Sequence, residues 1–524
     1  MKQKTKRLEK HKAWTFLIYS RFLLTLLLIL VQLAYYVYLC LRLTPYNNFL
    51  VGLNFVIGFA FIIYLINSSQ KNDFKLVWLI PVLIFPIFGI SMYFFTKLNY
   101  GKRKVGKKLS LAKEITNRFT ASTDHDEKAL ETFPEIRDIA TYTKSIEHFP
   151  CFSGNRTTYY PSGEAALPDM LFALEKAKRF IFLDYFVIQI GTFWDQVLKI
   201  LVERARHGVQ VRILFDSIGS VGLASRRFRR ALKSLGIEAR EFMPMVPVFD
   251  MGLNNRDHHK IMDIDGKTCF TGGANLSDEY INRDHYRFAY WKDSVIQVEG
   301  SSVQSFTKMF LQIWHSHDKK TFEIESDCEK FLTVRTQDIK AAGAVIPYAD
   351  DGYNSQDLAE NVYHYILGKS QKYVHIMSPY LVLDDSILNA LIFAAGRGVD
   401  VKVIFPGNYD HYITYCIGLR FAKTLIQSGV HVYLYKPGFV HSKIFVADDL
   451  MATVGSVNLD YRSFDYHFEC GAFLFKTDSV RDIEKDFQAT LLQCEELTLE
   501  NYNSNVSRTR RLLGWLCKIF SPLM

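Results

Sequence analysis

The sequence lacks the signatures of several common kinds of site. Its eight cysteines form no Cys-x-x-Cys pair, and no His/Cys spacing typical of zinc is present. We therefore expect unpaired thiols in a reducing compartment and no metal cofactor. The chain also contains no G-x-x-x-x-G-K-[ST] loop, so no nucleotide site is expected.

Charge is missing from three long runs near the N-terminus, which cover residues 22–41, 49–66 and 76–96. At about 1.5 Å per residue, a helix of about twenty residues matches the roughly 30 Å hydrocarbon core of a bilayer. The sequence therefore predicts a membrane region over residues 1–100 that is built from transmembrane helices. Polar or proline residues interrupt the second and third runs, so the first run is the most regular.

Basic segments flank this region on both sides. The leader MKQKTKRLEKHK and the stretch KLNYGKRKVGKK (97–108) are both strongly basic, and such segments tend to stay on the cytoplasmic side of a membrane. Three full spans would put them on opposite sides, so the number of spans and the orientation of the N-terminus stay open. We expect a multi-pass protein of the cell membrane whose large globular part faces the cytoplasm. The net charge of +9 favours an anionic partner, either lipid headgroups or nucleic acid.

After a polar connector (101–148), the sequence alternates strand-like and helix-like segments and repeats itself. GVQVRILFDS (208–217) is echoed by GVDVKVIFPG (398–407), and LKSLGIEAREFMP (232–244) is echoed by LIQSGVHVYLYKP (425–437). These patterns predict an α/β fold of two pseudo-symmetric halves, each a mixed sheet flanked by helices. The first half covers residues 149–320, and the second covers residues 340–500.

The pattern H-x-K-x4-D-x6-G-x2-N occurs once in each half. Its members are His258, Lys260, Asp265, Gly272 and Asn275 in the first copy, and His441, Lys443, Asp448, Gly455 and Asn458 in the second. Five fixed positions would arise by chance in roughly one chain of this length in several thousand. Two copies at corresponding places of a repeat therefore indicate a functional site made by both halves.

The spacing of each copy suits the binding and transfer of a phosphoryl group. A histidine and a lysine two residues apart on a strand point to the same face of the sheet. After a turn, the glycine lets a backbone approach closely, and the asparagine offers an amide donor. Two copies together would enclose one anion with two histidines, two lysines and two asparagines, without a metal. One histidine can then attack phosphorus while the other protonates the leaving oxygen.

Four carboxylates accompany the motif. Asp293 and Glu469 follow the histidines of the first and second half, and each is a candidate partner for a ring nitrogen. A carboxylate in that place would set a histidine's tautomer and stabilise its cationic form. Asp265 and Asp448 are either part of the chemistry or residues of a turn or salt bridge, and both interpretations stay open.

At these residues the sequence resembles the phospholipase D superfamily and, within it, the bacterial cardiolipin synthases. The resemblance covers nearly the whole chain from about residue 22 and includes FDSIGS (215–220), NNRDHHKI (254–261), GGANLSDEYI (272–281), YWKDS (290–294) and VNLDYRSFDYHFE (457–469). Two positions depart from the family's pattern. Asp184 stands where the family usually has a glutamate, and His467 stands where it usually has an asparagine.

The resemblance implies transfer of a phosphatidyl group through a phosphohistidine intermediate. His258 would attack one phosphatidylglycerol with release of glycerol, and a second phosphatidylglycerol would resolve the intermediate to give cardiolipin. His441 would act as general acid and then as general base. The expected partner is an anionic phospholipid in a membrane. We expect the chain to bind neither nucleic acid nor a nucleotide. A hydrolase that uses water as the acceptor is the main alternative, and a nuclease of the superfamily is a second one.

The C-terminal tail RTRRLLGWLCKIFSPLM (508–524) is basic and amphipathic. On a helix, Leu512, Trp515, Leu516, Ile519 and Phe520 share one face. The tail is too short and too charged to span a membrane. We expect it to lie among lipid headgroups, and the alternative is a helix packed on the catalytic part.

Overall fold

The computed structural model describes residues 45–97, 100–120, 125–220, 225–243, 255–283, 288–316, 321–333, 339–353 and 356–523, together with residues 34, 38 and 223. The chain divides into two compact units. The N-terminal unit contains residues 1–104 and 245–253, and the main body contains residues 105–244 and 254–522.

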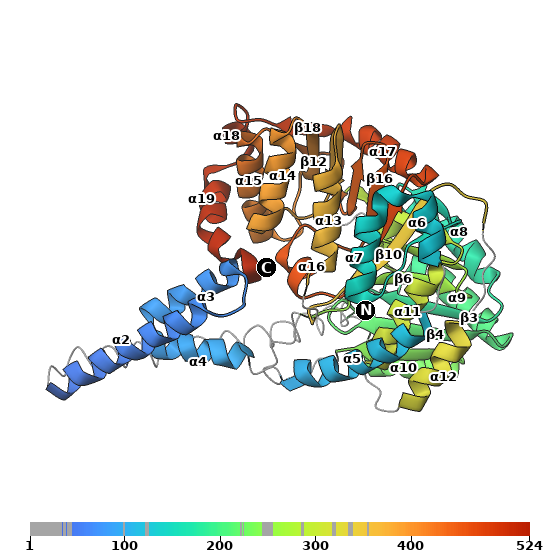
Figure 1. Cartoon of the computed structure of the whole chain (residues 1–524), viewed down its shortest axis with the longest axis horizontal. Coiled ribbons are helices and arrows are strands. Elements are labelled where there is room, and N and C mark those ends of the chain that lie inside the picture. The colour runs from blue at the N-terminus through green and yellow to red at the C-terminus, as the bar shows by residue number, and fades with distance from the viewer. Residues whose placement is uncertain are drawn as a thin grey trace, which may run out of the picture. The chain divides into compact units, whose positions relative to one another are not determined.

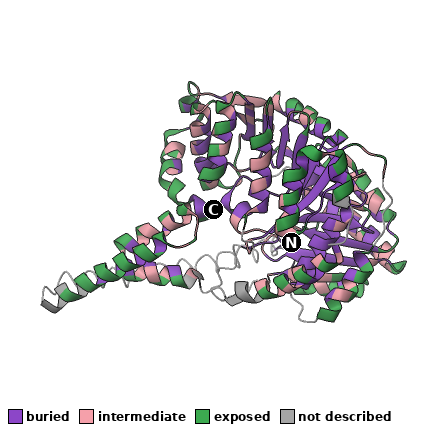
Figure 2. Cartoon of the chain, in the orientation of Figure 1, coloured by how far each residue is buried: buried purple, intermediate pink, exposed green. Residues whose placement is uncertain are grey.

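The described part of the N-terminal unit consists of three helices, α2 (Pro45–Ile66), α3 (Asn72–Ile84) and α4 (Pro86–Lys97). They pack around a small core in which Phe61, Leu65, Val82 and Tyr93 are buried. Much of their remaining apolar surface is exposed, as Figure 2 shows for α2. Large side chains such as Phe55, at 66% exposure, and Phe59, at 65%, have no protein to cover them among the described residues.

The third hydrophobic run of the sequence (76–96) does not form one continuous spanning helix. It divides into α3 and α4, because Pro86 lacks an amide proton and restricts the residue before it. That residue, Phe85, leaves the helix with a φ of −137°. The sequence predicts transmembrane helices here, but no helix in the described part of the chain is both long and apolar enough to cross a membrane. The first run (22–41) lies outside the described residues except for residues 34 and 38.

The main body contains one large sheet in each half (Figure 1). The first sheet contains β2 (Arg156–Tyr160), β3 (Phe180–Tyr185), β4 (Gln210–Asp216), β5 (Glu238–Phe242), β6 (Lys260–Ile264), β7 (Thr268–Gly272) and β9 (Val295–Glu299). The second sheet contains β1 (Phe152–Ser153), β10 (Ala344–Asp350), β11 (Tyr373–Met377), β12 (Asp400–Pro406), β13 (His431–Tyr435), β15 (Ile444–Ala447), β16 (Met451–Gly455), β17 (Glu469–Phe475) and β18 (Cys494–Leu497). The central strands are buried along their whole length, which explains their nearly continuous apolar sequences.

The two sheets have the same topology. The strand order is β2-β9-β7-β6-β3-β4-β5 in the first sheet, and the second sheet contains the matching order β10-β17-β16-β15-β11-β12-β13. In both, three parallel strands are followed by antiparallel neighbours. The predicted α/β fold with two pseudo-symmetric halves and mixed sheets is therefore confirmed.

Helices cover the faces of the sheets, and Figure 2 shows that many of them have mixed burial whereas the strands are buried. In the first half these are α8 (Gly163–Glu175), α9 (Thr192–Arg206), α10 (Ser225–Ser234), α11 (Val303–His315) and α12 (Thr321–Phe331), with a 3-10 turn η4 (Asp278–Ile281). In the second half they are α13 (Leu358–Lys369), α14 (Asp385–Gly396), α15 (Tyr412–Gln427), α16 (Tyr461–Asp465) and α17 (Asp478–Leu491). Aromatic side chains fill much of the core, and the rings of Phe182 and Phe310 stack with centroids 4.3 Å apart.

The polar connector of the sequence is largely helical. It forms α5 (Tyr100–Thr120), α6 (His125–Thr132), a short 3-10 turn η1 (Pro134–Ile136) and α7 (Arg137–Glu147). Lys113 on α5 forms ion pairs with Glu147, at 2.8 Å, and with Asp351, at 2.6 Å. The connector is therefore fixed to the second half by partly buried charges, rather than being a loose linker.

Strands exchanged between the halves join them into one body. The short strand β1 precedes the first half in sequence but pairs with β10 of the second sheet. A separate two-stranded sheet joins β8 (Trp291–Lys292) of the first half to β14 (Phe439–Val440) of the second. The boundary predicted at residue 149 therefore falls before a strand that belongs to the other half's sheet.

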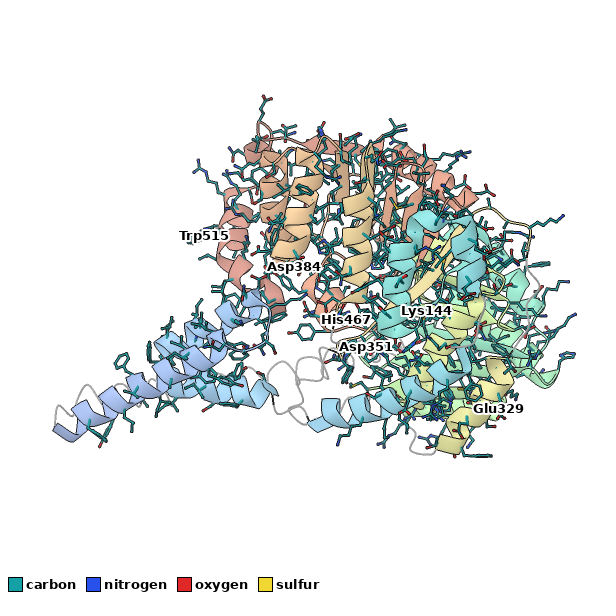
Figure 3. The ribbon with its side chains drawn as sticks, viewed as in Figure 1. Lys144, Glu329, Asp351, Asp384, His467 and Trp515 are labelled. Carbon is teal, nitrogen blue, oxygen red and sulfur yellow. The ribbon has the colours of Figure 1, made fainter. Side chains whose placement is uncertain are left out.

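The C-terminal tail forms α18 (Tyr502–Asn505), α19 (Arg508–Cys517) and a 3-10 turn η5 (Lys518–Leu523). α19 packs on α15 through Gly514, where a Cβ atom would lie 2.3 Å from the carbonyl oxygen of Cys416. The opposite side is exposed, with Leu512 at 57%, Trp515 at 64% and Leu516 at 50%. Trp515, labelled in Figure 3, marks this face on α19. The tail thus has one packed side and one uncovered apolar side.

Candidate active site

The two copies of the motif meet where the halves face each other. Lys260 begins β6 and Lys443 directly precedes β15, so equivalent strands of the two sheets deliver equivalent side chains. The backbone N–H of His258 donates to the carbonyl of Phe468 in the second half, at 2.9 Å. The N–H of His441 donates to the carbonyl of Lys292 in the first half, at 2.6 Å. Each histidine is therefore fixed by the backbone of the opposite half.

The motif glycines permit the close approach of strands beside the histidines. Gly272 ends β7 with a φ of +145°, and a Cβ atom there would lie 2.3 Å from the carbonyl oxygen of Ser294. At Gly455, which ends β16, a Cβ atom would lie 2.4 Å from the carbonyl oxygen of Cys470. Any larger residue would push away the strand that carries the carboxylate partner of a histidine.

Each histidine forms a hydrogen bond with a carboxylate of the other half. His258 Nδ1 lies 2.9 Å from both carboxylate oxygens of Glu469. His441 Nδ1 lies 2.7 Å from Oδ2 of Asp293. All four side chains are buried. Because each Nδ1–H donates to a carboxylate, the Nε2 atom is left with its lone pair. The predicted histidine–carboxylate partnership is present, and it crosses between the halves.

Burial has the largest effect on the pKa values of the two histidines. It lowers the pKa of His258 to about 3 and the pKa of His441 to about 4, although the neighbouring carboxylates oppose the shift. Burial also opposes ionisation of Glu469 and Asp293, but attraction to their histidines holds the pKa of both carboxyls below the usual range. Near neutral pH the empty site therefore contains two neutral imidazoles and two carboxylates.

The two lysines bring positive charge into the same buried space. Lys260 Nζ donates to the carbonyl of His258 at 2.7 Å, whereas Lys443 Nζ lies 2.8 Å from Nδ1 and 3.1 Å from Nε2 of His441. Burial lowers the pKa of Lys260 to about 8 and the pKa of Lys443 to about 7. Buried ammonium groups that have lost their hydration interact strongly with an anion that enters the site.

Two serines in the second half make the site asymmetric, and the sequence analysis did not identify them. Ser456 and Ser463 both donate to the carboxylate of Glu469, Ser463 at 2.8 Å. In the first half Gly273 takes the place of Ser456, and a Cβ atom there would lie 1.9 Å from Oδ1 of Asp293. The only sequence signal was this glycine-to-serine difference directly after the motif glycine.

Aromatic side chains line the histidines. The Phe186 ring lies 5.1 Å from the His258 ring, and the Tyr280 and Trp291 rings lie 5.4 and 5.0 Å from the His441 ring. These rings restrict both imidazoles to one orientation and lower the local dielectric. They come from the first half, where the resemblance motifs GGANLSDEYI and YWKDS place Tyr280 and Trp291.

The two motif asparagines differ in their surroundings. Asn275 Nδ2 donates to the Tyr280 hydroxyl at 2.8 Å, and its Oδ1 accepts from the N–H of Val187 at 3.0 Å. Asn458 is 5% exposed, and its Oδ1 has no hydrogen-bond partner within the described structure. Asn275 Nδ2 carries a second N–H besides the one given to Tyr280, and substrate binding by the asparagines stays a prediction.

The motif aspartates lie at the opposite ends of their strands from the histidines. Asp265 directly follows β6, and its carboxylate accepts from the backbone N–H groups of residues 178, 179 and 180 at 2.7–2.9 Å. Asp448 follows β15 and accepts in the same way from residues 371, 372 and 373, also at 2.7–2.9 Å. Both have positive φ, 59° and 57°. This geometry favours the turn interpretation over a part in the chemistry.

A second group of buried acids lies beside the catalytic pairs. His259 Nδ1 lies 3.3 Å from Asp184 and 3.2 Å from Asp257. Burial raises the pKa of Asp184 to about 7 and the pKa of Asp257 well above its usual value. The nearby charge of Asp184 adds to the upward shift of the pKa of Asp257. The aspartate at position 184 thus interacts with His259, the residue that directly follows the motif histidine His258.

Two groups of side chains bring three potential metal ligands within 4.8 Å of one another: His258, His467 and Glu469, and also Asp184, Asp257 and His259. In the first group, Glu469 is already bonded to His258 and to both serines. His467 Nδ1 is 3.6 Å from Glu469, and Figure 3 labels His467 near the centre of the body. The expectation of a metal-free site stays a prediction.

Comparisons with known proteins identify the family. The family model described as "Cardiolipin synthase, PLD-like domain" matches residues 170–314 and 364–491, and one described as "Phospholipase_D-nuclease N-terminal" matches residues 56–97. A cardiolipin synthase of Geobacillus sp. is 30% identical over 90% of this chain and 92% of its own length. An uncharacterized protein of Streptococcus mutans is 38% identical over 88% of this chain and 99% of its own length. The resemblance predicted from the sequence is confirmed.

A solved structure supports the fold. The phosphatidylserine synthase of Haemophilus influenzae aligns with a TM-score of 0.56 and covers 74% of this chain and 98% of its own. At 14% identity this similarity concerns the fold alone. It agrees with the two pseudo-symmetric halves described above.

We expect Asp265→Ala to lower the free energy of unfolding by about 2–3 kcal/mol, because three backbone N–H groups lose a charged acceptor. Asp265→Asn should lose less, since asparagine keeps one acceptor oxygen and tolerates positive φ. Thermal and urea unfolding would measure both changes. The control is Asp482→Ala, which removes an exposed partner of Lys485 and should change stability by less than about 0.5 kcal/mol. Unchanged stability of Asp265→Ala would contradict the turn role.

Proposed function

Since this chain belongs to the cardiolipin synthases of the phospholipase D superfamily, we propose that it transfers a phosphatidyl group between two phosphatidylglycerol molecules, giving cardiolipin and glycerol. The observation that carries the proposal is the crossed arrangement of two imidazole–carboxylate pairs around two buried lysines. That arrangement suits a two-step transfer at phosphorus, with one histidine for attack and one for proton transfer.

We assign the attack to His258. Within the described residues its Nε2 atom has no hydrogen-bond partner, while its Nδ1–H is held by Glu469. Both ring nitrogens of His441, in contrast, lie within 3.1 Å of Lys443 Nζ. A neutral imidazole with a free Nε2 lone pair is the nucleophilic form. The low pKa of His258, about 3 because of burial, keeps it in that form.

In the first step, the Nε2 atom of His258 forms a bond to phosphorus, and the bond from phosphorus to the glycerol oxygen breaks. His441 donates the proton that the departing oxygen takes up, and glycerol leaves. Burial lowers the pKa of His441 in the empty site to about 4. An anionic phosphodiester beside the ring raises this pKa, and Asp293 stabilises the resulting imidazolium. Proton donation is thereby coupled to substrate binding.

In the second step, the terminal hydroxyl of another phosphatidylglycerol gives its proton to His441 and attacks phosphorus. The bond between phosphorus and His258 then breaks, which restores the neutral imidazole. Lys260 and Lys443 stabilise the charge on the phosphoryl oxygens in both steps. A phosphodiester replaces a phosphodiester, so the reaction needs no nucleotide. Water as the acceptor would instead give phosphatidic acid, the product of the alternative hydrolase.

We further propose that the N-terminal unit lies at the membrane and that the main body faces the cytoplasm. The exposed apolar side chains of α2 and the basic stretch at 97–108 support this placement. Phosphatidylglycerol and cardiolipin are both membrane lipids, so a catalytic body held near the surface meets substrate without carrying it through water.

The function is tested with purified full-length protein and phosphatidylglycerol labelled with 32P in mixed micelles. We expect labelled cardiolipin and one equivalent of glycerol for each cardiolipin, without phosphatidic acid as the main product. Acid-free quenching during turnover should trap label on His258, because a phosphohistidine is the intermediate. His441→Ala should slow turnover by at least about a hundredfold.

Different results of this experiment would contradict different parts of the proposal. Phosphatidic acid as the main product would show a hydrolase. Label on His441 in place of His258 would reverse the assigned roles, and a protein that turns over without label on either histidine would contradict the covalent mechanism. His364→Ala, which changes a histidine paired with Glu360 on α13, serves as the control and should retain turnover.

The lysines predict a fall in rate at alkaline pH. Burial lowers the pKa values of Lys443 and Lys260 to about 7 and about 8, so the free enzyme loses positive charge as the pH rises through this range. We expect kcat/KM to decrease above about pH 7–8, and kcat to decrease at higher pH because a bound phosphodiester favours the ammonium forms. Lys443→Arg should move the alkaline limb upward, because arginine keeps its charge. A kcat/KM profile that is flat to pH 9 would contradict this assignment.

The uncovered face of α19 predicts a dependence on the lipid surface. Trp515→Glu combined with Leu516→Glu should reduce activity on phosphatidylglycerol vesicles about tenfold or more, because both exposed side chains would enter the headgroup region. Activity on monomeric short-chain phosphatidylglycerol should stay within about twofold. Phe322→Glu combined with Leu492→Glu, at sites 78% and 89% exposed, is the control. Equal losses on both substrates would instead indicate that this face of α19 only packs on the protein.

A further inference from the structure

A basic hollow lies on the outer side of the first half, away from the motif strands. Its volume is about 690 Å³, and α10, the edge strand β5 and Trp314 line it. β5 ends the first sheet, and β3 and β4 separate it from β6, which begins with Lys260. α10 lies at the lower right of the body in Figure 1. The hollow shares no lining residue with the histidine pairs.

Positive charge is concentrated on the side of α10 that faces the hollow. Arg226, Arg229, Arg230 and Lys233 line it, and their spacing of three, four and seven residues places them on one face of the helix. The sequence of α10, SRRFRRALKS, contains no acidic residue. Like charges at this spacing on one helix face repel each other and destabilise the helix. The arrangement therefore gains stability when an anion occupies the hollow.

The opposite wall presents a guanidinium group in a fixed position. Arg240 donates to the carbonyl of Trp314 at 2.7 Å, and its guanidinium lies 4.3 Å from the centre of the Trp314 ring. Arg212 contacts the same ring at 5.1 Å and is itself paired with Asp327. Because Arg240 is held by both a hydrogen bond and a cation–π contact, it loses little side-chain entropy when it binds an anion.

Few carboxylates neutralise this charge. Glu238 is the carboxylate among the lining residues, and Glu241 forms an ion pair with Arg229 at 3.5 Å. Within the described part of the chain, five cationic side chains thus line the hollow, against one carboxylate. The simpler interpretation of the basic residues on α10 is a helix face that is exposed to water and binds nothing. The concave shape and the fixed guanidinium of Arg240 favour a binding site over a merely solvated surface.

We propose that this hollow binds a phosphate group, and that it is a second phosphate site of the chain that takes no part in the transfer reaction. The planar guanidinium group of an arginine can donate two parallel hydrogen bonds to two oxygens of a phosphate. Several arginines around one concave surface can therefore bind the same phosphate from different sides. The phosphate belongs either to the headgroup of an anionic phospholipid or to free phosphate. The site does not depend on the proposed transferase activity, because it uses none of the same residues.

The test uses the full-length protein in a nonionic detergent, with two probes measured by isothermal titration calorimetry. The probes are inorganic phosphate and dihexanoyl phosphatidylserine below its critical micelle concentration. The variant Arg226→Gln/Arg230→Gln/Lys233→Gln removes three exposed charges of the hollow, and Lys176→Gln/Lys178→Gln/Lys199→Gln removes three exposed charges elsewhere in the same half. Removal of like charges from α10 should not unfold it, and thermal unfolding checks this.

We expect the wild-type chain and the control variant to bind one more equivalent of probe than the α10 variant, or to bind it at least about tenfold more tightly. A loss seen with phosphatidylserine alone identifies a lipid headgroup as the ligand. A loss seen with inorganic phosphate, with or without the lipid, identifies the phosphate group itself. Identical stoichiometry and affinity of all three proteins for both probes would overturn the proposal. His258→Ala should retain the extra site, which separates this result from any failure of the proposed transferase activity.

Discussion

The crossed pairing of imidazoles and carboxylates is the interaction on which the rest of the site depends. Glu469 and Asp293 are fully buried charges, and a histidine of the other half donates a hydrogen bond to each of them. The same bonds set the tautomer of both rings. Each half therefore needs the other to orient its motif histidine.

The symmetry of the backbone is not matched by the side chains. Glu469 has hydroxyl donors from Ser456 and Ser463, whereas Asp293 has a glycine, Gly273, in the place of the first of these. Lys443 contacts the ring of its histidine, whereas Lys260 donates to the backbone carbonyl of His258. The two halves share one topology, and the different tasks proposed for the two identical motifs rest on small differences of this kind.

The sequence predicts those parts of the structure that depend on local spacing. Histidine and lysine two residues apart fall on one side of a strand, and the repeat of apolar strands gives the same topology twice. Pro86 was also visible in the sequence as an interruption of the third run, although that run was still included among the predicted transmembrane helices. The partners of Glu469 and Asp293 could not be assigned to the opposite half, because spacing along the chain carries no information about which sheet faces which. The same limit applies to Ser463, which reaches the site only through the fold, and to Asp265, whose role depends on backbone N–H groups far away in sequence.

The exchanged strand β1 has a consequence for the order in which the chain becomes a folded protein. On the ribosome, Phe152 and Ser153 emerge before the rest of the first half, but their partner strand β10 is made only after that half is complete. The segment that forms β1 therefore has no partner strand until the first half has been synthesised, and it then pairs with β10 at the edge of the second sheet. A nascent chain therefore completes the second sheet only with a strand that was made before the first sheet. The two halves should therefore melt together in a single cooperative transition, and a chain cut between them would leave two fragments that each lack a strand or a partner.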